Sequence, residues 1–133
     1  MLDTSFCIDV MRDKTPQLRE RFSLQAGAMA LSSVALHELF YGAVKSQRPD
    51  HARQKVLEFA SRVTVLDFDD DAASHAGDIR ARLLQQGQEI GPYDVLIAAH
   101  ARSLGLAIVT GNMREFARIE GLLCENWLSE TPS

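Results

Sequence analysis

The feature that most constrains the fold is a regular alternation between helix-forming segments and short apolar segments. Residues 62–68 (RVTVLDF) are rich in β-branched side chains and alternate in polarity, which predicts a strand. A helix is then expected to begin at Asp69 and end at Gly87, and another to begin at Pro92, before the apolar segment 106–109. This alternation predicts an α/β fold with a mainly parallel sheet that helices cover on both faces.

The same signals extend over the rest of the chain. Further strands are expected at residues 1–3, 28–31 and 122–124. Further helices are expected at residues 6–12 (capped by Thr4 or Ser5), from Pro16 (after Thr15), at residues 34–46 (after Ser32 and Ser33) and from Pro49. We therefore expect one α/β/α sandwich domain over residues 1–128, with a short sheet of four to five strands, and a loose tail at residues 129–133.

The composition argues against several classes of protein. The 133 residues carry a net charge of −4, from 14 Lys and Arg against 18 Asp and Glu, so bulk positive charge is not available for binding nucleic acid. No apolar run approaches the roughly 20 residues of a membrane span, and the first residues lack the pattern of a signal peptide. We therefore expect a cytoplasmic protein in which Cys7 and Cys124 stay reduced.

Two acidic residues stand in otherwise apolar surroundings. Asp3 ends the first expected strand, directly before a helix start. Glu38 lies inside the apolar helix 34–44 (VALHELFYGAV), where a charge costs several kcal/mol unless it is paired or bound. A helix-capping role would explain Asp3, and an ion pair with an arginine would explain Glu38. A bound cation would explain both.

A third acidic residue opens a helix that is apolar on nearly all sides, residues 91–101 (GPYDVLIAAHA). Asp94 shares a helix face with Ile97, Ala98 and Ala101, at i+3, i+4 and i+7, so we expect its side chain to point inward. Two explanations remain open: Asp94 caps the helix, or it binds something positive.

A fourth polar region, IVTGNMREF, places Thr110 at the end of an expected strand and Asn112 and Glu115 just after it. Ligands in parallel α/β sheets bind beyond the carboxyl ends of the strands, although an ordinary turn into a short helix would also explain these residues. Converging carboxylates stay ionised only when divalent cations lie among them. Hard oxygen ligands of this kind suit Mg²⁺ or Mn²⁺, which activate water for phosphodiester cleavage.

Other polar residues have simpler explanations. No serine or cysteine is evidently paired with a histidine for catalysis, so core or surface positions are expected for His37, His51, His75 and His100. Asp69, Asp70 and Asp71 point in different directions at a helix start, which is typical of a solvated cap. Solvated helix faces and RNA phosphates are equally good explanations for Lys45, Arg48, Arg80 and Arg82.

Four segments, in order along the chain, resemble the PIN-domain ribonuclease toxins of the VapC type: LDTS, SSVALHELFYGA, GPYDVLIAAHARSLG and IVTGNMREF. Each short motif is weak by itself, but the ordered set runs over nearly the whole chain and is specific. The resemblance implies a PIN-like domain and a metal-dependent endoribonuclease, with Mg²⁺ as the ion and Mn²⁺ as its substitute.

Carried over residue by residue, the resemblance implies that Asp3 and Asp94 bind the metal and that Glu38 and Glu115 complete the catalytic set. Many members place an aspartate where this chain has Asn112, whereas members with a TNNxREF pattern resemble this chain better and take the fourth acid from the position of Glu115. The fourth group of the site is therefore Asn112 or Glu115.

The resemblance also implies supporting roles, in which Thr110 and Asn112 orient a ligand or water and Thr4 and Ser5 act beside the first aspartate. Ser5 departs from the family, which usually has asparagine there; a serine can still donate a hydrogen bond.

The resemblance implies partners as well. A VapB-type antitoxin would neutralise the chain, the substrate would be RNA and commonly tRNA, and DNA would be bound only through the antitoxin. A homodimer is expected, with the apolar stretch 39–44 (LFYGAV) as a candidate surface.

Two other functions fit the same residues. Asn112 and Ser5 allow a catalytically weak PIN-like domain that only binds RNA or its antitoxin. A DNA nuclease of the same fold would need a surface that grips a duplex, which the acidic net charge does not favour.

Overall fold

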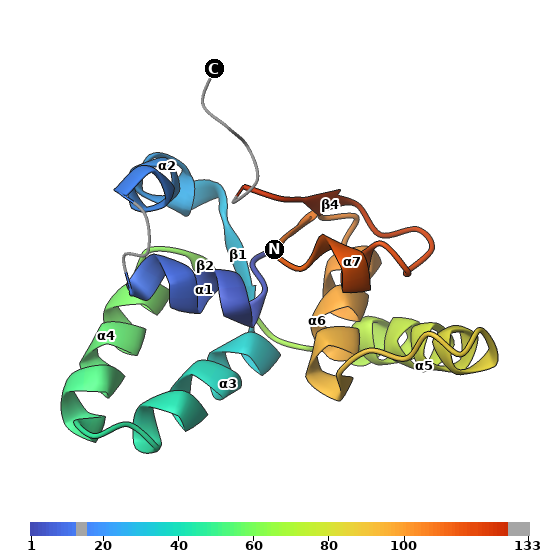
Figure 1. The fold of residues 1–133 in the computed structure, drawn as a ribbon, viewed down its shortest axis with the longest axis horizontal. Helices are drawn as coiled ribbons and strands as arrows, with labels where there is room; N and C mark the ends of the chain where they lie inside the picture. The colour runs from blue at the N-terminus through green and yellow to red at the C-terminus, as the bar shows by residue number, and fades with distance from the viewer. Residues whose placement is uncertain (13–15, 128–133) are drawn as a thin grey trace. The chain divides into compact units, whose positions relative to one another are not determined.

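The alternation of helices and short parallel strands is present in the computed structural model, which describes residues 1–12 and 16–127 (Figure 1). The helices of this part of the chain are α1 (Thr4–Met11), α2 (Pro16–Gln25), a 3-10 helix (Ala26–Ala28), α3 (Ser33–Val44), α4 (Pro49–Ser61), α5 (Asp70–Gln85), α6 (Pro92–Ser103) and α7 (Met113–Phe116). The strands are β1 (Ala30–Ser32), β2 (Thr64–Leu66), β3 (Ile108–Val109) and β4 (Cys124–Glu125). The predicted α/β class is therefore confirmed. Thr15 and the expected tail lie outside the described residues.

The strands pair in parallel, as expected, but in two small sheets. Strand β1 pairs with β2, with Ala30 opposite Thr64, and β3 pairs with β4, with Ile108 opposite Cys124. The expected first strand is reduced to a single bridge, in which the backbone N–H of Leu2 donates to the carbonyl of Ala30 at 2.9 Å. Strands of two or three residues support only short ladders, which is why a continuous sheet of four to five strands is not formed within the described residues.

The chain divides into two compact units, each of which is described here by itself. The N-terminal unit is Leu2–Asp67, and the C-terminal unit is Met1 together with the chain from Phe68 onward. Met1 belongs to the second unit because its nitrogen donates to the carbonyl of Ala107 at 2.7 Å, and its carbonyl accepts from the N–H of Val109 at 2.7 Å.

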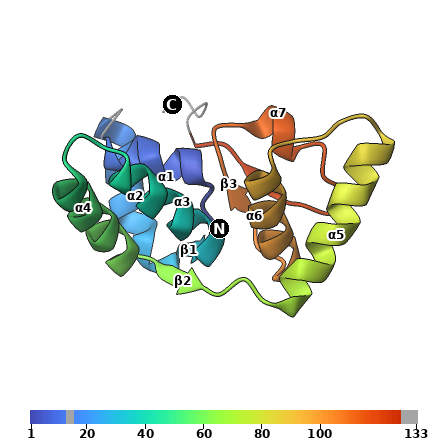
Figure 2. The same ribbon diagram turned by 90° about the horizontal axis from the view of Figure 1, so that it is seen from below.

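In the N-terminal unit, α3 packs against α1 and α4 (Figure 2). The rings of Phe22 and Phe59 stack with centroids 5.1 Å apart, and Phe6, Leu31 and Leu39 are buried with them. Burying a large apolar side chain stabilises the fold by about 1.5–3 kcal/mol, so these helices are held mainly by this core.

In the C-terminal unit, α5 and α6 pack against each other (Figure 2). The face predicted from helical spacing is buried: Ala72, Ala76, Ile79 and Leu83. Helix α6 is buried from Ile97 to Ala101, and this stretch includes His100, whose ring meets the ring of Phe68 edge-on at 5.6 Å. His100 is thus a core histidine, as expected.

The helix starts follow their predicted signals, with one correction. The hydroxyl of Ser32 caps α3 by accepting from the N–H of Val34 at 3.1 Å, and Asp69 caps α5 by accepting from Ala72 at 2.9 Å. Helix α1 begins at Thr4, however, so the expectation that Thr4 or Ser5 is its cap is wrong. Three consecutive residues here are able to cap, and the sequence signal does not choose among them.

Among the described residues, no helix combines the length and the apolar character that a membrane span requires.

Candidate functional site

Asp3 is the cap of α1 and is nearly inaccessible, with only 2% of its surface exposed. Its Oδ1 accepts a hydrogen bond from the backbone N–H of Phe6 at 2.8 Å. A carboxylate at this position is stabilised both by that N–H and by the positive end of the helix dipole. The capping explanation for Asp3 is therefore confirmed, and it leaves room for a second role.

Glu38 is linked to the start of α1 through Thr4. The hydroxyl of Thr4 donates to Oε1 of Glu38 at 2.7 Å, although 34 positions separate the two residues in sequence. The three residues Asp3, Thr4 and Glu38 are called the α1–α3 acid cluster below. Ser5 is exposed on α1.

The arginine partner that the sequence allowed for Glu38 is not present among the described residues. Within residues 1–12 and 16–127, Glu38 makes no ion pair with an arginine, and Thr4 is its hydrogen-bond donor. The half-buried carboxylate of Glu38 is therefore held in place by a neutral hydroxyl and not by an opposite charge.

The thiol of Cys7 lies near this cluster and does not compete with it. Burial first, and then the negative charge of Asp3, raise the pKa of the Cys7 thiol well above its usual range. Cys7 and Cys124 are both free cysteines, as predicted. Because the thiolate is the form that binds metal, Cys7 remains a core side chain.

Asp94 lies in the C-terminal unit, in the first turn of α6, where it is half-buried. The N-cap residue of this helix is Gly91, and Asp94 follows it by three positions. The carboxylate folds back toward the helix start: its Oδ2 would lie 3.4 Å from a Cβ added to Gly91. The inward orientation expected from Ile97, Ala98 and Ala101 fits this position, since all three are fully buried.

The turn after β3 is organised by Thr110, which is fully buried. Its Oγ1 accepts from the backbone N–H of Asn112 at 2.8 Å. Asn112 precedes α7 and caps it without a side-chain hydrogen bond, while Glu115 is half-buried inside that short helix. Thr110 therefore fixes the loop that carries both polar candidates of this region.

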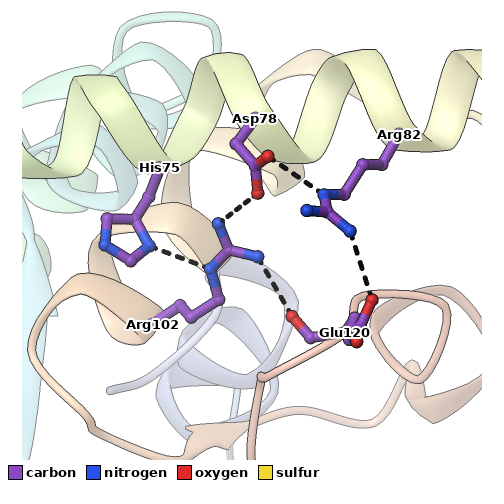
Figure 3. A network of polar contacts seen from close by, with 5 residues as sticks. All are labelled: His75, Asp78, Arg82, Arg102 and Glu120. Carbon is purple, nitrogen blue, oxygen red and sulfur yellow. Dashed lines mark hydrogen bonds and ion pairs between the residues drawn. The ribbon is translucent and has the colours of Figure 1, made fainter.

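A polar network that the sequence did not reveal joins α5, α6 and the loop before β4 (Figure 3). The guanidinium of Arg102 donates to Nδ1 of His75 at 2.9 Å, to Oδ2 of Asp78 at 2.8 Å and to the carbonyl of Glu120 at 3.0 Å. Arg82 donates to the other oxygen of Asp78 at 3.0 Å and to Oε2 of Glu120 at 3.3 Å. Hydrogen bonds from Arg102 and then Arg82 lower the pKa of Asp78.

This network has a structural purpose. Arg102 has only 14% of its side chain exposed and ties together three segments of one unit. The spacing of Asp78 and Arg82 at i and i+4 was a visible signal for the local pair, but the partners of Arg102 are far apart in sequence. Arg82, for which the sequence allowed an RNA contact, is exposed at the surface and pairs there with Asp78 and Glu120.

The donor atoms near the candidate acids suit a hard cation. Carboxylate and hydroxyl oxygens are the ligands that Mg²⁺ and Mn²⁺ prefer, and the α1–α3 acid cluster offers only such atoms. Within the described part of the chain, no three His, Cys, Asp or Glu side chains are gathered as a ready-made metal site. The metal assignment therefore depends on the chemistry of the donors and on the family.

The fold and its acidic residues define an α/β protein with carboxylates at helix starts. Comparison with known proteins identifies the family to which this α/β protein belongs. The PIN domain model matches residues 1–122. The chain is 53% identical over 127 residues to a tRNA(fMet)-specific endonuclease VapC of Shigella flexneri, and the aligned region covers 96% of each protein.

Solved structures agree with the sequence match. The crystal structure of DNA-bound VapBC from Salmonella typhimurium aligns with a TM-score of 0.91 at 50% identity and covers 96% of both chains. VapBC2 from Rickettsia felis, solved with a DNA fragment from its promoter, aligns with a TM-score of 0.89 at 35% identity, covering 96% of this chain and 97% of that one. The chain therefore belongs to the PIN domain family and, within it, to the VapC ribonucleases. Nucleases of the PIN family are typically metal-dependent.

Proposed function

We propose that this chain is the toxin of a type II toxin–antitoxin pair and a metal-dependent endoribonuclease that cleaves tRNA(fMet). The observation that carries the proposal is the 53% identity, over 96% of both proteins, to a tRNA(fMet)-specific endonuclease VapC. The match covers 127 of the 133 residues of this chain.

The proposed ligands of the ion are Asp3 and Asp94, with Glu38 and Glu115 completing the catalytic set. Each acid has local support within its own unit: Asp3 is fixed by the N–H of Phe6, and Glu38 by the hydroxyl of Thr4. Asp94 is placed in the first turn of α6, and Glu115 on α7 after the loop that Thr110 orders.

The chain's own residues have separate tasks in this mechanism. When bound, Mg²⁺ lowers the pKa of water and offsets the negative charge of the phosphodiester. Asp3 and Asp94 would hold the ion, and Glu38 would accept a proton from the attacking water. The water would add in line to phosphorus as the opposite P–O bond breaks, and the leaving ribose oxygen would take up a proton from solvent. Thr4 positions Glu38, and Thr110 positions Asn112. Ser5, exposed at the start of α1, would contact the RNA beside Asp3.

The proposed partners follow from the relatives. The matched structures from Salmonella typhimurium and Rickettsia felis are VapBC complexes bound to DNA. We therefore expect a VapB-type antitoxin to neutralise this chain, a homodimer to form, and DNA to be bound only through the antitoxin. A tRNA substrate would place the activity in the cytoplasm.

The test is cleavage of purified tRNA(fMet) by the purified chain. We expect cleavage with Mg²⁺ or Mn²⁺, no cleavage in EDTA, and full recovery when the ion is returned. Elongator tRNA(Met) and double-stranded DNA serve as the substrate controls. Cleavage that continues in EDTA would contradict the metal-dependent mechanism, and cleavage of DNA at the same rate would contradict the substrate.

A second candidate is a catalytically weak domain that binds RNA or the antitoxin without turnover. It is favoured by Asn112, which stands where many proteins that this chain resembles have an aspartate. The two candidates differ in one measurement: the weak domain would bind labelled tRNA(fMet) and leave it intact at every Mg²⁺ concentration.

A further inference from the structure

We infer that the exposed face of α3 formed by Tyr41, Gly42 and Lys45 binds the stretch of RNA next to the cleaved phosphodiester. This RNA-binding face of α3 rests on the proposed function, because it assumes that the substrate is RNA. It assigns a role to side chains that neither the core nor the acid cluster uses.

The first argument is alignment with the acid cluster. Tyr41, Gly42 and Lys45 follow Glu38 by three, four and seven positions, so they lie on the same side of α3 as Glu38. The rise from Glu38 to Lys45 is about 10 Å, which is the length of about three stacked nucleotides at 3.4 Å each. A strand cleaved beside Glu38 would therefore continue along this face.

The second argument is the pairing of an aromatic ring with a cation. Tyr41 is 62% exposed, an unusual position for a large ring in the middle of a helix. The Lys45 ammonium lies 4.9 Å from the centre of that ring. Faces that bind single-stranded nucleic acid combine these two groups, since bases stack on aromatic rings and phosphates attract lysine.

The third argument is charge. Within residues 1–12 and 16–127, the Lys45 ammonium has no carboxylate partner, and the contact with Tyr41 does not neutralise its charge. By contrast, the arginines of the α5–α6 network already have acidic partners. In a chain of net charge −4, an unpaired cation beside an exposed ring suits a phosphate.

The fourth argument is open space between the two side chains. A Cβ added to Gly42 would have no atom of the protein within 4 Å. Glycine inside a helix is unfavourable relative to alanine, and the core does not require it here. Close approach of an RNA backbone to this position gives Gly42 a reason to lack a side chain.

The experiment measures binding separately from cleavage. The affinity of the purified chain for fluorescein-labelled tRNA(fMet) is measured by anisotropy in EDTA, and cleavage is measured in Mg²⁺. Tyr41→Leu should weaken binding about tenfold, because stacking of one base is worth about that factor, whereas Tyr41→Phe should keep wild-type affinity. Lys45→Gln should weaken binding and reduce the slope of log affinity against log salt by about 0.7.

Two matched controls separate this face from general effects. Lys55→Gln removes an exposed lysine from α4 in the same unit and should leave the affinity unchanged. Gly77→Ala changes a glycine in α5 that likewise has open space around it. It should leave RNA binding unchanged, while Gly42→Ala should weaken binding at least threefold.

The outcomes distinguish this inference from the proposed function. Wild-type chain that binds tRNA(fMet) without cleaving it would overturn the proposed endoribonuclease but support the α3 face if Tyr41→Leu weakens binding. Equal affinity of wild type and Tyr41→Leu, with cleavage intact in both, would overturn the α3 face alone. If Tyr41→Leu lowers the mass in light scattering to that of a monomer and keeps RNA affinity, the face is instead an interface between copies of the chain.

Discussion

The two units differ in the partners of their acidic side chains. In the N-terminal unit, Glu38 accepts one hydrogen bond from the neutral hydroxyl of Thr4 and has no arginine partner among the described residues. In the C-terminal unit, Asp78 lies between the guanidinium groups of Arg102 and Arg82. The comparison shows which carboxylates have their charge balanced by the protein and which remain able to attract a cation from solution.

The largest expected effect is a difference in the rate of tRNA cleavage between substitutions at two aspartates of the C-terminal unit. Asp94→Asn should lower the rate of tRNA cleavage by more than about a hundredfold, because even partners that only support a metal ligand are worth 10- to 100-fold. Asp78→Asn should leave the rate unchanged. Initial rates under saturating Mg²⁺ check both, with the urea midpoint as a measure of folding. Equal rates for Asp94→Asn and wild type would remove Asp94 from the catalytic set.

The second effect concerns the network of Figure 3. Arg102→Met keeps most of the aliphatic stem but removes three hydrogen bonds. The free energy of unfolding should fall by about 2 kcal/mol, since unsatisfied partners of a lost donor cost roughly 1–3 kcal/mol. Urea denaturation measures it, and Arg80→Met, an exposed arginine of α5, is the control. A loss of equal size in the control would show that the effect is not specific to the network.

The third effect tests the link between Thr4 and Glu38. Thr4→Val has nearly the same shape but no hydroxyl, so the turnover number should fall about tenfold, the equivalent of one hydrogen bond at the transition state. Thr4→Ser should restore most of the rate. Full activity of Thr4→Val would mean that Glu38 does not depend on Thr4 for its position.

The fourth effect compares one glycine in each unit. Gly42 in α3 and Gly77 in α5 both have open space where a Cβ would lie. Each change to alanine should raise the free energy of unfolding by about 1 kcal/mol, as measured in urea. A stabilised Gly42→Ala chain with weaker RNA binding would exclude misfolding as the cause of that loss. Destabilisation in either variant would show that the site is more crowded than the structure indicates.

The smallest expected effect is a pH dependence of the stability that Asp78 contributes. Hydrogen bonds from Arg102 and Arg82 hold the pKa of Asp78 below its ordinary value of about 3.9. This contribution to stability is present above the unfolded pKa and is lost as pH falls through the folded one. The urea midpoints of wild type and Asp78→Asn should therefore differ by a constant amount above about pH 5 and converge as the pH falls through the unfolded pKa of about 3.9 and then through the lower folded pKa. A constant difference down to pH 2 would contradict the assigned hydrogen bonds.

Helix positions were predicted well because their signals are local. Pro49, Pro92 and Asp69 each mark a helix start that the structure confirms, and Gly87 ends α5 with a positive φ of 64°. A glycine tolerates that backbone conformation without strain.

Strand ends were less predictable. The strand expected at residues 28–31 is found at Ala30–Ser32, because Ala26–Ala28 form a 3-10 turn, and the strand expected at residues 62–68 is limited to Thr64–Leu66. Apolar character continues past the point where pairing stops, and pairing depends on a partner that is distant in sequence.

The candidate site could be predicted where an acidic residue stands in an otherwise apolar segment. Glu38 stood out because it is a charge in an apolar helix, and the structure finds it held by Thr4. The contacts of Arg102 with His75, Asp78 and Glu120 could not be predicted in this way, because charged residues on helix surfaces are common and do not stand out in the sequence. The metal-binding and catalytic roles of the acids stay predictions that the mutations above address.

Asp3 caps α1 and, on the proposed function, would also hold the metal ion, which has a practical consequence for genetics. In a screen for cells that survive expression of the chain, changes at Asp3 would be recovered by two routes, a disordered first turn or an inert but intact enzyme. Asp3→Asn is the informative allele, because an amide oxygen still accepts the Phe6 N–H while carrying no charge. It is the version to choose for trapping uncut RNA.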